Sequence, residues 1–289
     1  MTDQRLGIYR LLEKVAEGGA GTVYRAQVTS RPESPPVALK LLDDRRLTEP
    51  QMVARFRREA KILAALRHRA IAGLLDFDEV VIGSGRDARR HLFLVLEWVE
   101  GRDLSDLLAE RGRLAVADTV ELGRQVADAL VTAHEAGVVH RDLKPRTLRV
   151  TPRGEVRVLD FGLAKILAES HLARQGVATF QTTAGAVMGT ARYMAPEQLL
   201  GRPVDGRTDL YSLGSVLYRC LAGRDPFDAR SFLSLVRSIT EEHPPPLREA
   251  RPEAPAPLAE LIHYLLAKEP ADRPASAAEV RERLAGVGT

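Results

Sequence analysis

A lysine and a glutamate occupy positions where a charged side chain is costly. Lys40 lies within the apolar run 37–42, which has the pattern of a buried strand. A buried ammonium group needs an anion beside it, or it loses its charge. Glu59 falls in the apolar stripe of segment 50–66, whose spacing predicts a helix. A single glutamate at such a position usually reaches water, but the two residues together predict an ion pair.

Several glycines lie earlier in the chain than the strand with Lys40, in the connection between the strand-like runs 9–16 and 22–28. Gly18, Gly19 and Gly21 would allow backbone N–H groups at the tip of a hairpin to approach an anion closely, and phosphate is the natural candidate. A glycine-rich hairpin is more often only a turn. The phosphate interpretation therefore depends on the buried cation that follows the hairpin.

Three motifs follow further along the chain: His140-Arg141-Asp142-Leu143-Lys144-Pro145, then Asp160-Phe161-Gly162, then Ala195-Pro196-Glu197. This set, in this order, resembles the protein kinase superfamily. Residues 189–198 are similar to the matching segment of bacterial eukaryotic-like serine/threonine kinases. The resemblance extends from about residue 9 to residue 284, which is nearly the whole chain.

The resemblance implies an α+β, bilobal protein-kinase-like fold. A small antiparallel β-sheet with one main helix would form the N-lobe, residues 1–99, and a larger, mainly helical C-lobe would occupy residues 100–289, with a hinge at 97–99. The hydrophobic periodicity agrees with this division. It predicts strands at 9–16, 22–28, 37–42, 73–82 and 92–97, helices at 50–66, 116–136, 205–222, 258–268 and 276–284, and short strands near Leu148 and Val156.

The resemblance also implies an activity, the transfer of the γ-phosphoryl group of Mg-ATP to serine or threonine hydroxyls of proteins. Such a reaction needs positioning and charge neutralisation more than covalent chemistry. Lys40 would hold the α- and β-phosphates, kept in place by Glu59, and Asp160 would carry Mg²⁺. Asp142 would accept the proton of the substrate hydroxyl, while Lys144 would neutralise charge on the γ-phosphate. A lysine at position 144 is typical of serine/threonine kinases.

The same resemblance outlines a nucleotide pocket. Leu96 would be the gatekeeper residue, and backbone groups of Glu97 and Val99 would bond to adenine. The complete set of implied ATP-binding residues is Val15, Gly18, Gly19, Gly21, Val23, Ala38, Lys40, Glu59, Leu96, Glu97 and Val99.

Two further residues are implied as structural supports rather than as participants in the reaction. Asp209 would brace the backbone of the catalytic loop, and Arg273 would pair with Glu197.

A regulatory switch is implied by Arg141, a fixed cation next to Asp142. In related kinases this arginine receives a phosphate from the activation segment. A phosphate on Thr182 or Thr183 could dock there and order the segment, although both threonines could equally be ordinary polar loop residues. Thr190 would instead orient Asp142 and Lys144 from the substrate side.

Three positions depart from the family pattern. Thr147 replaces the second metal-binding residue, an asparagine, and a hydroxyl is a poorer and shorter ligand than an amide carbonyl. Arg149 replaces an apolar side chain under the adenine, where it could stack on the base or block it. Ala16 replaces the first glycine of the loop, which is the mildest change.

These departures keep two alternatives open. The chain could be a pseudokinase scaffold with weak or no phosphoryl transfer, because of Thr147 and Arg149. It could also be a small-molecule phosphotransferase of the same fold, although the Ala195-Pro196-Glu197 motif and its partner Arg273 argue against that class.

The composition is that of an ordinary folded protein, with 45% hydrophobic and 28% charged residues. The net charge is +3, but the arginine residues are scattered along the chain rather than gathered in one stripe, which argues against nucleic-acid binding. No apolar run approaches the roughly 18 residues of a membrane span, and no signal peptide is expected. Cys220 is the single cysteine and is predicted to be a core thiol, which suits a cytoplasmic protein. The expected partners are protein substrates and a second copy during autophosphorylation.

Overall fold

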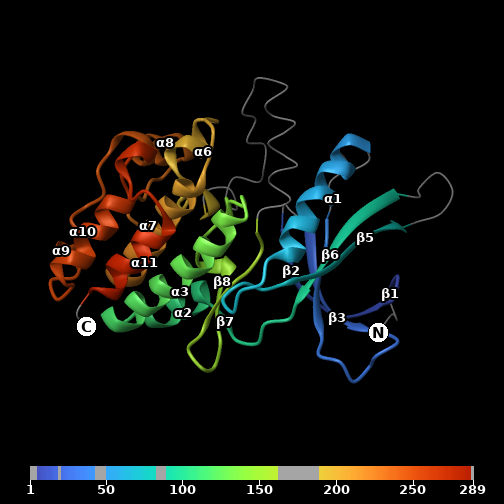
Figure 1. The fold of residues 1–289 in the computed structure, drawn as a ribbon. Coiled ribbons are helices and arrows are strands. Elements are labelled where there is room, and N and C mark those ends of the chain that lie inside the picture. The colour runs from blue at the N-terminus through green and yellow to red at the C-terminus, as the bar shows by residue number, and fades with distance from the viewer. Residues whose placement is uncertain (1–4, 19–20, 43–49, 83–88, 162–188, 288–289) are drawn as a thin grey trace. The chain divides into compact units, whose positions relative to one another are not determined.

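An antiparallel sheet with one helix forms the first of two compact units (Figure 1). The computed structural model describes residues 5–18, 21–42, 50–82, 89–161 and 189–287. Within these ranges, the first unit comprises residues 5–67 and 72–99, and the second comprises residues 68–71 and those from 100 onward. The strand order of the sheet is β1-β2-β3-β4-β6-β5. Its elements are β1 Arg5–Leu6, β2 Tyr9–Gly18, β3 Gly21–Val28, β4 Val37–Leu41, α1 Pro50–Ala65, β5 Leu74–Ile82 and β6 Arg89–Glu97.

The two faces of this sheet carry separate apolar cores, as the alternation of side chains along a strand requires. Strand β6 contributes Phe93 and Val95 to one core and Leu92 and Leu94 to the other, which α1 covers. Lys40 on β4 lies directly opposite Leu94 in the β4–β6 register. Because directly opposed residues share a face of the sheet, Lys40 lies on the face that packs against α1.

The second unit is mainly helical, with a small three-stranded sheet in the order β7-β8-β9. Its helices surround α7, which is buried along almost its entire length. Figure 1 shows α7 among α3, α10 and α11. The elements are β7 Arg102–Asp103, α2 Leu104–Arg111, α3 Val116–Glu135, the 3₁₀ turn η3 Pro145–Thr147, β8 Leu148–Val150, β9 Val156–Val158, α6 Pro196–Leu199, α7 Gly206–Ala222, α8 Phe232–Glu241, α9 Leu247–Ala250, α10 Ala256–Leu265, η4 Pro270–Asp272 and α11 Ala277–Ala285.

Close packing of α7 against α10 depends on a glycine. A Cβ atom added at Gly214 would lie 2.7 Å from Cβ of Leu265, which is closer than side chains approach each other. Cys220 on α7 is fully buried, and the prediction of a core thiol is therefore confirmed. Among the helices that the structure describes, none has both the length and the apolar character that crossing a bilayer requires.

The predicted fold class, an α+β fold with a small antiparallel sheet and a larger helical part, is confirmed. The predicted bounds of one helix were wrong. The helix predicted at 258–268 spans Ala256–Leu265, and beyond its end the carbonyl groups of Ala267 and Lys268 accept hydrogen bonds from Arg273. No helix was predicted in the proline-rich segment 243–257, which contains α9. Helices α2 and α8 were not predicted, although both carry apolar residues at helical spacing.

Candidate active site

The loop with the His140–Pro145 motif is held by a buried carboxylate on α7. Asp209 is 0% exposed, and its two oxygens accept the backbone N–H groups of His140 and Arg141, each at 2.8 Å. Nε2 of His134 lies 2.8 Å from the same carboxylate. A buried carboxylate is stable only with such donors around it. The prediction that Asp209 braces the loop backbone is confirmed.

Arg141 and Asp160 are the non-glycine residues with left-handed backbone in the part of the chain that the structure describes, with φ of 64° and 59°. This conformation costs about 1–2 kcal/mol at each residue. At Arg141 the loop is enforced by Asp209 and by Gln198, whose Nε2 donates to the Arg141 carbonyl at 2.8 Å. Backbone strain of this kind clusters at functional sites, and here it marks two of the predicted motifs.

Next to Arg141, Asp142 and Lys144 form an ion pair. Nζ of Lys144 donates to Oδ2 of Asp142 at 2.9 Å and to Oγ1 of Thr190 at 3.3 Å. The side chains of Asp142 and Lys144 are 26% and 17% exposed, so both remain accessible from solvent. A proton acceptor, a cation and a hydroxyl group are thus brought together. This arrangement can take a proton from a hydroxyl and balance negative charge beside it.

The segment that leads to Asp160 is tied to the same loop. The carbonyl of Leu159 lies 2.9 Å from Nε2 of His140, and the N–H of Leu159 donates to the carbonyl of Thr147 at 2.8 Å. The ring of Phe161 lies 4.7 Å from that of His140, between centroids. The second unit therefore brings the Asp142 and Asp160 segments together.

The hydroxyl group of Thr147 is engaged inside the catalytic loop. Oγ1 accepts the N–H of Lys144 at 3.1 Å and donates toward the carbonyls of Asp142 and Lys144, at 3.1 and 3.0 Å. The hydroxyl proton and one of the two oxygen lone pairs are thus used within the loop, where this side chain closes the turn η3. The role of Thr147 as a metal ligand stays a prediction.

Arg149 on β8 bonds to Asp103, its cross-strand partner on β7. Its Nε and Nη2 atoms donate to Oδ1 of Asp103 at 3.0 and 2.8 Å. Stacking on adenine and blocking of adenine both stay predictions, but the guanidinium group has a defined position within its own unit.

The predicted pair of Glu197 and Arg273 is confirmed. Two parallel hydrogen bonds of 2.8 Å join the side chains, both of which are buried. Burial by itself raises the pKa of Glu197, but the hydrogen bond and charge of Arg273 outweigh it and hold the pKa below its ordinary value. Thr208 adds a hydrogen bond of 2.7 Å to the same carboxylate.

Several contacts of the segment 190–198 were not predicted from the sequence. Asp225 accepts hydrogen bonds from Arg192 at 2.8 Å and from Tyr193 at 2.9 Å. Ser212 on α7 donates to the carbonyl of Tyr193 at 2.8 Å, and Gln198 holds the catalytic loop as described above. Arg192, Tyr193 and Gln198 lie within residues 189–198, the segment that resembles bacterial eukaryotic-like serine/threonine kinases. Asp225 carries no comparable signal, because its partners are 32 and 33 residues away.

In the first unit, glycine at position 21 is required by the hairpin itself. Gly18 pairs with Gly21, whose φ is 126°. A Cβ atom at Gly21 would meet the carbonyl oxygen of Leu41 at 2.0 Å. Backbone packing therefore explains this glycine without a bound phosphate, and phosphate binding by the hairpin stays a prediction.

The remaining pocket residues of the first unit follow the register of its strands. Val23 lies opposite Lys40, and Ala38 lies opposite Leu96. Val15 is exposed and Val99 is buried. The N–H of Glu97 donates to the carbonyl of Gly73 at 2.9 Å.

Other predictions stay open. Lys40 and Glu59 are both half-buried. Their burial does not test whether they form an ion pair. That pair therefore stays a prediction, as does the convergence of Lys40 with Asp142 and Asp160. Gly19, Thr182 and Thr183 lie outside the described residues.

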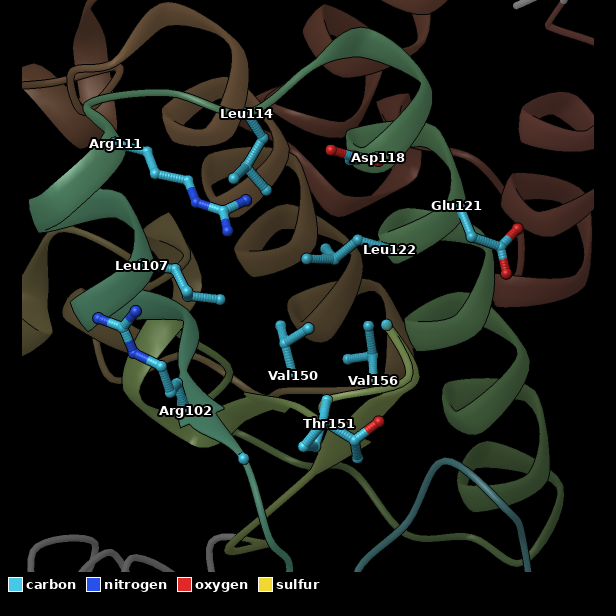
Figure 2. A pocket seen from close by; sticks show the side chains of 13 residues that line it. Arg102, Leu107, Arg111, Leu114, Asp118, Glu121, Leu122, Val150, Thr151 and Val156 are labelled. Atoms are coloured by element: carbon cyan, nitrogen blue, oxygen red, sulfur yellow. The ribbon is translucent and has the colours of Figure 1, made fainter.

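A separate hollow of about 530 Å³ lies in the second unit, between α2, the start of α3 and the β8–β9 turn (Figure 2). Its floor is apolar, with Leu107, Leu122 and Val156, while Arg111 and Glu121 belong to its rim. None of the catalytic-loop residues lines it. It is therefore distinct from the candidate active site.

Comparisons with known proteins agree with this arrangement. The family model described as protein kinase domain matches residues 9–283. The chain is 41% identical over 287 residues to serine/threonine-protein kinase pkn3 of Myxococcus xanthus, covering 96% of this chain and 50% of that protein. It is 38% identical over 282 residues to serine/threonine-protein kinase PknA of Mycobacterium tuberculosis, covering 97% of this chain and 61% of that protein. The chain thus spans one half to about three fifths of these relatives. It belongs to the protein kinase domain family.

Proposed function

We propose that this chain is a serine/threonine protein kinase domain, which transfers the γ-phosphoryl group of ATP to protein hydroxyls. The observation that carries the proposal is the contact of Lys144 with both Asp142 and Thr190, on a loop that Asp209 holds. The relatives support it, because they are named as serine/threonine-protein kinases. The alternative of a pseudokinase finds no support in these comparisons.

In the proposed reaction, Asp142 accepts the proton of the substrate hydroxyl as its oxygen bonds to the γ-phosphorus. The bond from that phosphorus to the β,γ-bridging oxygen breaks, and ADP leaves with the electron pair. Lys144 balances the negative charge on the transferred group, since its ammonium is held beside the carboxylate at 2.9 Å. Thr190, bonded to the same ammonium, fixes its direction.

The residues are suited to a nucleotide and Mg²⁺. Asp160 offers a carboxylate, the kind of hard oxygen ligand that Mg²⁺ prefers, and Lys40 offers a cation for the α- and β-phosphates. When bound, the metal neutralises phosphate charge. Thr147 suits a metal less well, because its hydroxyl already bonds within the loop. The glycine-rich hairpin and residues 96–99 would enclose the rest of the nucleotide.

Regulation by phosphorylation is part of the proposal. A phosphate on Thr182 or Thr183 would dock on Arg141 and order the activation segment, with a second copy of the chain acting as the enzyme. Residues 1–99 and 100–289 would act as the two lobes. The cytoplasm is the proposed compartment, because the single thiol, Cys220, suits reducing conditions.

An ATP-turnover assay with a generic basic protein tests the proposed function. Asp142→Asn is nearly isosteric, but it cannot accept the hydroxyl proton, so we expect phosphate incorporation to fall about 10²–10⁴-fold. Asp118→Asn, an exposed change on α3, serves as the matched control. Mass spectrometry should find the product phosphate on serine or threonine. Equal incorporation in the wild type and in Asp142→Asn would refute the proposal.

A further inference from the structure

Asp225 accepts hydrogen bonds from Arg192 and Tyr193, two neighbouring residues of the segment 190–198. It lies between α7 and α8, and its side chain is 12% exposed. Its Oδ2 accepts a hydrogen bond from Nη1 of Arg192 at 2.8 Å, and its Oδ1 accepts a hydrogen bond from the hydroxyl of Tyr193 at 2.9 Å. Arg219, on α7, places Nε 3.8 Å away. Both oxygens of one nearly buried carboxylate therefore hold the segment 192–193.

A short turn links this anchor to the candidate active site. The N–H of Tyr193 donates to the carbonyl of Thr190 at 3.3 Å, and the N–H of Met194 donates to that of Ala191 at 3.1 Å. At the other end of the turn, the Thr190 hydroxyl accepts a hydrogen bond from the Lys144 ammonium at 3.3 Å. One tight turn and at most two intervening residues thus separate the bonds to Asp225 from the bond to Lys144. Tyr193 and Thr190 are therefore joined directly by a backbone hydrogen bond of the same turn.

The chemistry of the anchor favours a fixed geometry. Arg192 is held from two sides, by Asp225 and by the more exposed Asp228 at 2.9 Å. Burial and the charge of Asp225 raise the pKa of Tyr193, so that its phenol remains a neutral donor. Charge-assisted hydrogen bonds to a carboxylate are shorter and stronger than neutral ones. Ser212 holds the Tyr193 carbonyl from α7 at the same time.

We propose that Asp225 is a positioning residue for phosphoryl transfer. By holding Arg192 and Tyr193, it keeps the hydroxyl of Thr190 against Lys144, and thereby fixes the ammonium beside Asp142. This inference rests on the proposed function, since it assigns Asp225 to the same reaction. Asp225 touches neither substrate nor nucleotide in this account, and it acts only through the segment 190–193.

The test compares Asp225→Asn with wild type in steady-state kinetics. The amide keeps the size of the side chain but removes the charge that Arg192 binds. We expect kcat to fall about 10-fold, because small displacements of reacting groups are costly, with the KM for ATP unchanged within about twofold. Tyr193→Phe removes one hydrogen bond and should give a smaller fall. Asp118→Asn is again the matched control.

A double-mutant cycle separates positioning from general stability. If Asp225 acts through Arg192, then Arg192→Met and Asp225→Asn together should reduce kcat little more than either change alone. Fully additive losses, or a kcat of Asp225→Asn equal to that of the control, would overturn the inference. A purely structural role would instead leave kcat per folded molecule at the wild-type value, because partial unfolding removes active enzyme without changing the molecules that remain folded.

Amide hydrogen exchange distinguishes failure of this inference from failure of the proposed function. Asp225→Asn should speed exchange in residues 190–194, whether or not the protein transfers phosphate. If the wild type is inactive but exchange is faster in the variant, the proposed function is refuted, while the claim that Asp225 holds the segment 190–193 is supported. An active wild type with unchanged exchange in the variant would refute the anchor alone.

Discussion

The guanidinium group of Arg149 is bound to the carboxylate of Asp103, directly across the β7–β8 ladder. The two side chains are only 17% and 23% exposed. This contact places a cation within the small sheet of the second unit, at a position where the kinase family usually has an apolar residue. Asp103 and Arg149 therefore have to be considered as one pair when either is changed.

Replacing Asp103 by Ala should destabilise the protein by about 1–3 kcal/mol, because it removes two charge-assisted hydrogen bonds to a partly buried guanidinium group. Arg149→Met should cost less. The double variant Asp103→Ala with Arg149→Met should be more stable than the sum of the single losses predicts. Urea unfolding of the four proteins measures each free energy.

The neighbouring pair of Arg102 and Glu110 is a suitable control, since its side chains are 51% and 58% exposed. Arg102→Ala should cost no more than about 1 kcal/mol, as is usual for exposed ion pairs. A cost of Asp103→Ala no greater than that of Arg102→Ala would contradict the importance of the β7–β8 pair.

Replacing Thr147 by Asn should lower the Mg²⁺ concentration needed for half-maximal ATP turnover several-fold. An amide carbonyl reaches further than a hydroxyl and is a better oxygen ligand. A titration of turnover against Mg²⁺ measures the change. Thr147→Val is the control, because it removes the hydroxyl bonds to the loop and supplies no ligand. The prediction fails if the titration curve does not move, or if Thr147→Val moves it equally.

Stability should decrease as the pH falls below 6.5, in part because of His263 on α10. Burial lowers the pKa of this imidazole from its ordinary 6.5, and its Nε2 accepts the N–H of Leu247 at 3.0 Å. The folded state then binds fewer protons than the unfolded state between the lowered pKa and 6.5. The stabilisation is therefore present above pH 6.5 and is lost as the pH falls toward the folded-state pKa.

Urea midpoints at pH 7.5 and 5.5 test this behaviour. His263→Gln keeps a hydrogen-bond acceptor but does not titrate, so its midpoint should change less between the two pH values than that of the wild type. The exposed His243, replaced by Gln, is the control and should behave as the wild type does. The same pH response in His263→Gln and in the wild type would show that other groups cause it.

Much of the fold could be predicted because its signals are local. Strands β2 to β6 and helix α1 follow from alternation and helical spacing within runs of 5 to 16 residues. The motif around Asp142 identified the catalytic loop for the same reason. Supports such as Asp209 and Arg273 were predictable only through the family resemblance, because each acts on residues 68 or 76 positions away.

The sequence by itself determined the family, the longer strands, most of the long helices and the candidate reactive side chains, since these depend on residue type and short-range spacing. The tertiary structure decided where each polar group finds its partner. In the folded protein, Arg149 donates a hydrogen bond to Asp103, and the Thr147 hydroxyl bonds within its own loop. Arg192 and Tyr193 both donate hydrogen bonds to Asp225. A buried polar group takes whichever partner the packing brings within about 3 Å, and packing between distant segments is a property of the whole fold.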